Sequence, residues 1–293
     1  MGIDGSGTTR RPLLWAAREA RLRREPLVIC HAYPPLDHSA GLRSSASAGE
    51  RSDRLTWYAA ELAEAAEPGL TVVPAPVPAP VREALLGAVE LPCLVVIGTG
   101  GAGRMAEALL AEPTLGASGL GASGPIAVVR GSATGSGHPF AGHVVVAVEC
   151  PESDAAVTFA FMEAELRRLP LVAVGASARG TPGGLPGRDE TAAWAMVEAA
   201  VAPYRRRHRR VEAKLAVHAG HPVGGILKAA VDAALLVVGS ADPSAGAGGP
   251  VDGSMRHAAI TGAPCPVVVV PTVRDHPDGW PSRLPSHVIS SLR

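Results

Sequence analysis

Trp15–Tyr33 reads WAAREARLRREPLVICHAY, and the same pattern returns at Phe159–Ser177 as FAFMEAELRRLPLVAVGAS. Each stretch carries Leu-Arg-Arg near the end of an amphipathic segment and continues through Pro-Leu into an apolar run. Further along the chain, VREALLGAVELPCLVVIG ending at Gly98 matches GGILKAAVDAALLVVG ending at Gly239. Self-similarity in the same order along both halves indicates a tandem duplication.

The apolar runs of the two copies predict strands that are buried on both faces. They lack the alternation of a half-exposed strand and lie at Leu27–Cys30, Leu94–Ile97, Ile126–Val129, Val144–Val148, Leu235–Val238 and Val267–Val270. Continuous apolar runs are typical of parallel sheets covered by helices on both sides. Thr9–Arg24 and Ala155–Arg168 read as amphipathic helices. The predicted fold class is α/β, with two tandem doubly wound, Rossmann-like parallel-sheet domains.

The duplication also predicts the domain limits. We expect domain 1 over residues 1–131 and domain 2 over 143–272, with a linker at 132–142 and a flexible tail at 273–293. Pro34–Arg54 and Ala176–Thr191 are rich in Ser, Gly and Pro, which predicts mobile loops.

The first strand of copy one is short. Copy two opens with VVVAV before Glu149, whereas copy one supplies only Met-Gly-Ile before Asp4. Either the true start lies upstream of Met1 or the strand is a stub. A truncated central strand is expected to expose sheet edges and to weaken domain 1.

Composition excludes several classes of protein. The 293 residues include 27 Lys+Arg and 27 Asp+Glu, and this balance argues against a dedicated binder of nucleic acid or of acidic membranes. No run of about 18 apolar residues exists, and the first residues lack the apolar core of a signal peptide. The four cysteines are scattered and predict buried, reduced thiols. We therefore expect a cytoplasmic protein.

Candidate binding residues follow two strands of copy one. In open α/β sheets, ligands bind at the carboxyl ends of the strands. Asp4-Gly5-Ser6-Gly7 places a carboxylate and a tight turn after the first strand. Gly98-Thr99-Gly100-Gly101-Ala102-Gly103 follows a later strand, and its backbone N–H groups suit a phosphate. A plain glycine-rich connector explains this second stretch equally well.

Taken in order along the chain, these segments resemble the universal stress protein family, in its tandem actinobacterial form. The resemblance is carried by Asp4-Gly5-Ser6, the helix WAAREARLR, the strand ending VICHAY, the LVVIG and LVVGS strands, and GSMRHAAITGAPCPVVVV at Gly253–Val270. It implies an adenine nucleotide alpha hydrolase-like fold. It also implies that members with a full pocket bind ATP through an Asp after strand one, backbone after strand two, and a loop of pattern G-x2-G-x9-G-[S/T], whereas other members bind no nucleotide.

In copy one the resemblance assigns the nucleoside end but not the phosphate end. Asp4 and Gly5 match the acidic turn, Ala32 matches the backbone contact after strand two, and Gly98 and Gly101 match the first two glycines. Ala111-Glu112 stands where Gly-Ser/Thr is required, so a carboxylate would lie beside the phosphates and repel them.

Copy two departs from the pattern at other positions. Glu149 replaces the Asp in a turn one residue shorter, and Asp242 replaces the second glycine. The residues that match the family are Gly239 for the first glycine, Gly253-Ser254 for the last pair and Ala176 for the backbone contact. Neither copy keeps a complete pocket, and copy one is the better candidate for binding ATP.

Other functional interpretations are weaker. Gly98, Gly100 and Gly103 spell G-x-G-x-x-G, but no acidic residue follows about 20 positions on, as a dinucleotide site requires. GASGLGASG at Gly116–Gly124 only approximates a hydrolase elbow. The histidines lack metal-ligand spacing, and His31 reads as a core or loop histidine. The basic run Tyr204–Arg210 is interpreted as a solvated helix end.

We expect a binding or regulatory module with degenerate nucleotide pockets rather than a metabolic enzyme. The alternatives are an ATP-binding switch or weak ATPase that uses domain 1, and a purely structural role. Expected partners are an adenine nucleotide and an unidentified protein, with no nucleic acid and no membrane. Ile126–Val129 and Val267–Val270 are expected to pair within the chain as a pseudo-dimer, which leaves a homodimer as an alternative.

Overall fold

The computed structural model describes residues 1–6, 9–34, 42–88, 93–98, 124–130, 142–149, 153–177, 190–240 and 254–271. Repeat 1, the N-terminal copy, comprises α1 (Arg10–Arg23), β1 (Leu27–Tyr33), α2 (Leu42–Ala66), β2 (Val72–Pro78), α3 (Val81–Gly87), β3 (Val95–Gly98) and β4 (Ile126–Val129). Repeat 2 comprises β5 (Val144–Ala147), α5 (Asp154–Arg167), β6 (Leu171–Ser177), α6 (Glu190–Arg207), β7 (Ala213–Ala219), α7 (Pro222–Ala229), β8 (Leu235–Gly239), α8 (Ser254–Gly262) and β9 (Val267–Val270).

The strand order confirms the predicted doubly wound sheets. Seven strands form one sheet in the order β3-β4-β9-β8-β5-β6-β7, and β1 pairs with β2. All of these pairs are parallel except β4–β9. In repeat 2 the chain begins in the middle strand β5, moves outward through β6 and β7, and then crosses to β8 and β9 on the other side. This reversal is the arrangement that places ligand sites at carboxyl ends of strands.

Met1–Ile3 occupies the central strand position of repeat 1. Gly2 forms parallel bridges with Cys30 of β1 and with Ile97 of β3. The Ile3 N–H donates to the Cys30 carbonyl at 2.9 Å. These three residues, which we call the stub strand, therefore connect β1–β2 to the seven-stranded sheet.

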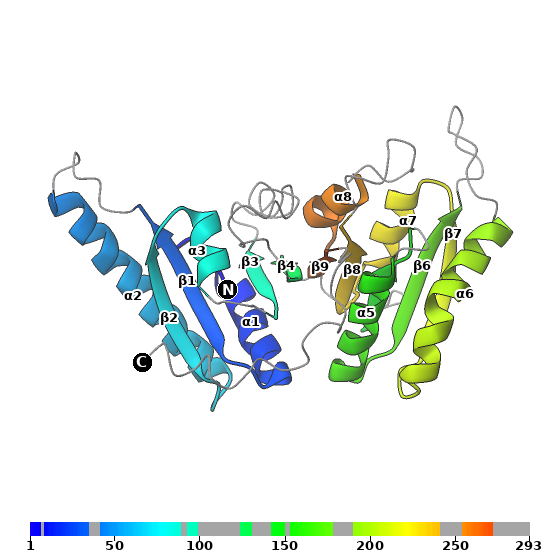
Figure 1. Ribbon diagram of the computed structural model, residues 1–293, viewed down its shortest axis with the longest axis horizontal. Coiled ribbons are helices and arrows are strands. Elements are labelled where there is room, and N and C mark those ends of the chain that lie inside the picture. Colours follow the sequence, from blue (N-terminus) through cyan, green and yellow to red (C-terminus); the bar gives the residue numbers. More distant parts are fainter. Residues whose placement is uncertain are drawn as a thin grey trace.

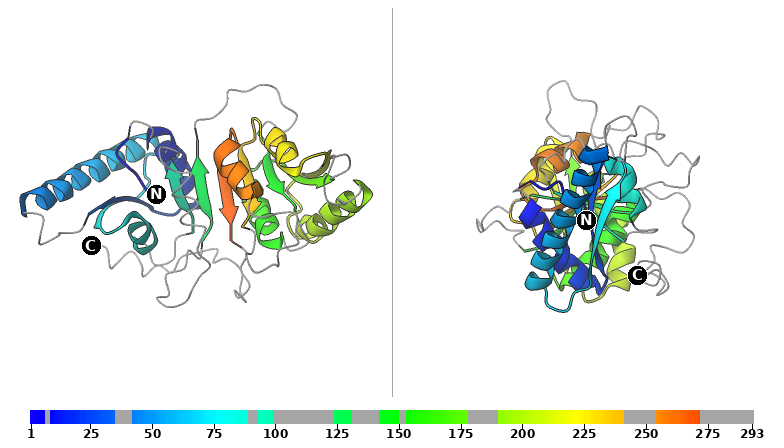
Figure 2. Two further views of the ribbon diagram at one scale, coloured as in Figure 1. Left: turned by 90° about the horizontal axis from the view of Figure 1, so that it is seen from above. Right: turned by 90° about the vertical axis from the view of Figure 1, so that its left-hand side faces the viewer.

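Helices cover both faces of the sheet, as Figures 1 and 2 show. One core contains buried residues of α1, α2, α5 and α6, and the other contains those of α3, α7 and α8. Alternation along β5 explains the division, because Val144 and Val146 join the first core whereas Val145 and Ala147 join the second. All four are at most 1% exposed. Burying each valine stabilises the fold by roughly 1.5–3 kcal/mol, which is how a chain poor in aromatic residues builds its cores.

The prediction of a loop over Pro34–Arg54 is wrong from Leu42 onward. Helix α2 begins there and continues to Ala66. Ala59, Ala60 and Ala63 of this helix are at most 5% exposed and anchor it on the sheet. No proline occurs in residues 36–67, so the helix extends toward its N-terminus without a steric break. The serines in this stretch lower helix propensity by too little to stop it.

Other predicted segments are placed in part. Ala176 and Ser177 belong to β6 and Glu190 begins α6, so the second predicted loop is shorter at both ends, and residues 178–189 lie outside the described residues. Almost all of the predicted linker at 132–142 and the whole tail at 273–293 also lie outside them. The domain limits therefore remain a prediction.

The two repeats meet where β4 pairs antiparallel with β9, near the centre of Figure 1. The register places Ile126 opposite Val269 and Val128 opposite Val267. This pair is the one anticipated for the pseudo-dimer. Arg130, which follows β4, donates from Nε and Nη2 to the Ile260 carbonyl of α8 at 3.1 and 2.8 Å. The contact between the repeats thus continues beyond the strands.

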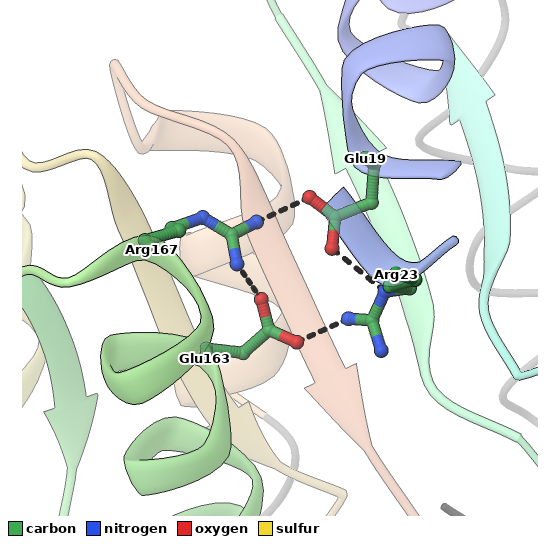
Figure 3. A network of polar contacts seen from close by, with 4 residues as sticks. All are labelled: Glu19, Arg23, Glu163 and Arg167. Atoms are coloured by element: carbon green, nitrogen blue, oxygen red, sulfur yellow. Dashed lines mark hydrogen bonds and ion pairs between the residues drawn. The ribbon is translucent and has the colours of Figure 1, made fainter. Parts of the chain in front are cut away.

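A closed ring of four charged side chains lies between α1 and α5 (Figure 3). Arg23 donates to Glu19 on its own helix at 2.8 Å and to Glu163 on α5. Arg167 likewise contacts Glu163 on its own helix and Glu19 on α1. The two glutamate side chains are 5% and 2% exposed, and the two arginine side chains are 15% and 10% exposed. Equivalent positions of the two copies thus form a pseudo-symmetric contact between the repeats, which we call the charge ring.

Candidate functional site

The turn after the stub strand fixes the Asp4 carboxylate by local hydrogen bonds. The Ser6 N–H donates to Asp4 Oδ1 at 2.9 Å, and the Thr9 hydroxyl donates to the same oxygen at 3.0 Å. Burial alone would raise the pKa of Asp4, but the hydrogen bonds from Ser6 and Thr9 outweigh it and hold the pKa below its usual value. Asp4 is exposed, so the turn presents an ionised, oriented acceptor to solvent.

Gly5 permits this turn. Its φ is +71°, in the left-handed region where a Cβ is unfavourable. A Cβ at Gly5 would also lie 3.0 Å from Leu55 Cδ1, so α2 packs directly over the turn. The prediction that this glycine allows a tight turn is confirmed.

Ala32 lies beside this turn on β1. Gly2 and Cys30, which stand two residues before Asp4 and Ala32, form a parallel bridge. Asp4 and Ala32 therefore lie side by side at the carboxyl edge of the sheet. Alternate residues of β1 direct their backbone groups toward the stub strand. The Cys30 N–H donates to the Met1 carbonyl, and the Cys30 carbonyl accepts from the Ile3 N–H. The same alternation directs the Ala32 N–H and C=O toward the Asp4 turn. The structure therefore brings the two predicted nucleoside contacts together.

Gly98 ends β3 on the other side of the stub. A Cβ at this position would lie 2.9 Å from Pro12 Cγ of α1, so close packing of helix on strand requires glycine. Glycine at position 98 is thus needed for helix packing, a role that the sequence did not reveal, in addition to its predicted place in a phosphate loop. Gly101 and the substituted pair Ala111-Glu112 lie outside the described residues.

In repeat 2 the corresponding residues lie at the ends of β5 and β8. Gly239 is the last residue of β8, and Ser254 begins α8, whereas Gly253 and Asp242 lie outside the described residues. Glu149 follows β5, and burial raises its pKa to about 7. The acidic position of repeat 2 is therefore partly protonated at neutral pH, in contrast to Asp4.

A hydrogen-bonded pair beneath the Asp4 turn was not anticipated. His31 Nδ1 lies 2.9 Å from Ser52 Oγ of α2, and the Ser52 hydroxyl is 3.3 Å from the His31 carbonyl. Burial lowers the pKa of His31, although the charge of Asp4 opposes this. Ser52 and Thr56 are fully buried on α2, one turn apart. No sequence signal pointed to this pair, because polar residues four positions apart ordinarily indicate an exposed helix face.

The basic run lies where the sequence placed it, at the end of α6. Arg205 pairs with Glu198 at 3.1 Å and donates to the Ala213 carbonyl at 2.7 Å, and His208 lies 2.8 Å from Glu165.

Within the described ranges, no helix is long and apolar enough to cross a membrane. The same part of the chain holds no cluster of three or more His, Cys, Asp or Glu suited to a metal ion.

Two doubly wound repeats, joined edge to edge and carrying an acidic turn at the carboxyl edge, define a tandem α/β protein of Rossmann-like fold. The chain belongs to the universal stress protein family, whose two matches cover residues 1–129 and 141–271.

Two of the similar proteins match nearly the full length of this chain. Universal stress protein Rv2623 of Mycobacterium tuberculosis is 28% identical, with 92% of this chain and 94% of that protein covered. The crystal structure of a universal stress protein from Archaeoglobus fulgidus DSM 4304 gives a TM-score of 0.61 at 18% identity and covers 94% of this chain and 96% of its own. A shorter Archaeoglobus fulgidus universal stress protein, solved in complex with dAMP, is 27% identical, covers 45% of this chain and 98% of its own, and gives a TM-score of 0.34.

Proposed function

We propose that this chain is a stress-response binding module with a regulatory output, and that repeat 1 binds the nucleoside part of an adenine nucleotide. The observation that carries the proposal is the Asp4 carboxylate, held ionised and exposed by Ser6 and Thr9 beside the backbone of Ala32. An ionised carboxylate accepts hydrogen bonds from the two ribose hydroxyls. Because its orientation is fixed before binding, little conformational entropy is lost when a ligand arrives.

The backbone of Ala32 supplies the complementary contact for the base. Its N–H and C=O extend past the end of the stub strand, toward the Asp4 turn. One donor and one acceptor on a single residue match the acceptor and donor on the edge of adenine. This pairing recognises the base without any side chain, which agrees with an alanine at this position.

The phosphate end of the ligand is expected to be short. Ala111-Glu112 replaces the Gly-Ser/Thr that the family pattern requires, so a carboxylate would face a triphosphate. AMP carries less charge into this region than ATP does. We therefore assign repeat 1 to binding without hydrolysis, and repeat 2, with Glu149 partly protonated, to a different role.

Isothermal titration of the full chain with AMP, ADP and ATP tests the proposal. AMP should bind saturably, and Asp4→Ala should weaken it by roughly 10–150-fold, as expected for a lost charge-assisted hydrogen bond. Glu212→Gln changes an exposed carboxylate of repeat 2 that pairs with Lys214; it is the control and should leave AMP affinity unchanged. Failure of AMP to bind, equal binding by Asp4→Ala, or release of phosphate from ATP would each contradict this assignment.

A further inference from the structure

In each repeat, a single helix connects the acidic turn at the carboxyl edge of the sheet to the charge ring. In repeat 1, Thr9 precedes α1 and donates to Asp4, and α1 ends at Arg23 in the ring. In repeat 2, the Ser153 hydroxyl before α5 accepts from the Glu149 N–H at 3.2 Å. Helix α5 then ends at Arg167, also in the ring. Each helix has 14 residues. Such a helix spans about 20 Å.

Helix α1 is packed too tightly to move at one end alone. Leu13, Ala16 and Ala17 are at most 1% exposed along its core face. Near its start, Pro12 closes on Gly98 so closely that a single added methyl group would clash. Displacing Thr9 therefore displaces the whole helix, because a packed helix shifts as a unit rather than bending. Arg23 at the far end must follow.

The charge ring transmits that displacement to the other repeat. Each carboxylate accepts one bond from its own helix and one from the opposite helix, so no bond can be lost without leaving a buried charge with fewer partners. The Arg23 guanidinium also lies 5.7 Å from the ring centroid of Phe159 on α5. A shift of α1 is therefore carried to α5 rather than absorbed between them.

We propose that the charge ring couples the two carboxyl edges, so that occupation of the Asp4 turn in repeat 1 alters the Glu149 turn in repeat 2, and the reverse. This inference rests on the proposed function, and it makes the duplicated chain a two-site device in which repeat 2 regulates nucleotide affinity at repeat 1. Coupling between sites is reciprocal, so either end can be used to measure it.

The first test measures AMP affinity in full-length ring variants. Glu163→Gln lies in repeat 2, yet it should change the Kd for AMP at repeat 1 by about fivefold or more. Arg167→Lys keeps the charge but replaces two bridging nitrogens with one, and should act in the same direction more weakly. Glu165→Gln is the matched control on α5, because Glu165 pairs with His208 and not with α1. It should leave Kd unchanged.

The second test is hydrogen exchange. AMP should slow exchange in α5 of the wild type but not of Glu163→Gln. Without any ligand, Glu163→Gln should speed exchange of the Ser6 amide, which donates to Asp4, by about fivefold or more. Val201→Ala, a change of a buried α6 residue that is not part of the ring, controls for general loss of stability.

The outcomes separate the two proposals. If AMP binds wild type and both ring variants equally, coupling is wrong and the proposed function stands. If AMP binds none of them, the proposed function is wrong, and the Ser6 exchange rate alone decides coupling: equal rates in Glu163→Gln and Val201→Ala overturn it.

Discussion

Ala127 of β4 lies opposite Val268 of β9, across the antiparallel pair that joins the two repeats. Both side chains are at most 1% exposed. Each strand would otherwise be the edge of its own repeat, with unpaired backbone groups open to aggregation. The pair therefore protects two edges at once, and a duplicated chain gains by pairing its own copies.

Val268→Glu tests how much the fold depends on this contact. An unpaired charge in the centre of a buried sheet should lower the free energy of unfolding by about 3–5 kcal/mol, measured by urea denaturation with tryptophan fluorescence. Val81→Glu is the control, since Val81 is 43% exposed. It should change stability by no more than about 0.5 kcal/mol. Equal midpoints for the two variants would show that β4–β9 contributes little.

The uninterrupted apolar runs were enough to predict the fold class, because strands buried on both faces of a parallel sheet show no alternation. The six runs located their strands to within one residue, except that β1 continues three residues beyond Cys30 to Tyr33. The first half of helix α2 was missed because it is rich in serine and because the anchor of the helix, at Ala59 and Ala63, lies further along the chain. Burial against the sheet makes that segment helical, and local composition alone does not predict such burial.

The candidate site was predictable only as far as the chain order allowed. Asp4, Gly5 and Ala32 meet because parallel strands end at one edge. The Ser52–His31 bond and the Pro12–Gly98 contact depend on which helix covers which strand. The charge ring had a signal in the repeat itself, since Glu19 and Glu163 occupy equivalent positions, but identical positions alone do not show that the two copies face each other.

The two strand-end glycines, Gly98 and Gly239, should respond differently to the same change. Gly98→Ala places a Cβ 2.9 Å from Pro12 Cγ and should cost about 1–3 kcal/mol, because a proline ring on a buried helix has little room to move. Gly239→Ala meets no described residue within 4 Å and should be neutral or stabilise by about 0.4–1 kcal/mol. Thermal unfolding of both variants decides the matter. If Gly239→Ala is destabilised, glycine is needed there for the backbone conformation of a turn and not for lack of room for a Cβ.

Glu149 should make the stability of the protein fall as pH rises. Burial raises its pKa from 4.5 to about 7 in the folded state, so the folded protein binds the proton more tightly than the unfolded chain does. The stabilising contribution is complete below about pH 4.5 and is lost progressively until the pH passes about 7, for a total of about 3 kcal/mol.

Urea denaturation between pH 5 and 8 measures this dependence. Glu149→Gln mimics the protonated form, so its stability should decline less over that range than the wild type's. Glu212→Gln is the control, because Glu212 is an exposed partner of Lys214. It should follow the wild-type curve. Parallel curves for wild type and Glu149→Gln would show that Glu149 titrates normally.

Removing one member of the charge ring should lower the free energy of unfolding strongly, whereas replacing all four members with apolar residues should not. Arg167→Met removes two of the four contacts and leaves Glu19 and Glu163, which are nearly buried, sharing one guanidinium. We expect a loss of about 3–5 kcal/mol. Replacing all four residues with Leu and Met of similar volume removes every buried charge and should be neutral or stabilising by about 1–4 kcal/mol. Urea midpoints of the single and quadruple variants measure both effects. A single variant that costs less than about 1 kcal/mol would indicate that water screens the ring as it screens a surface pair.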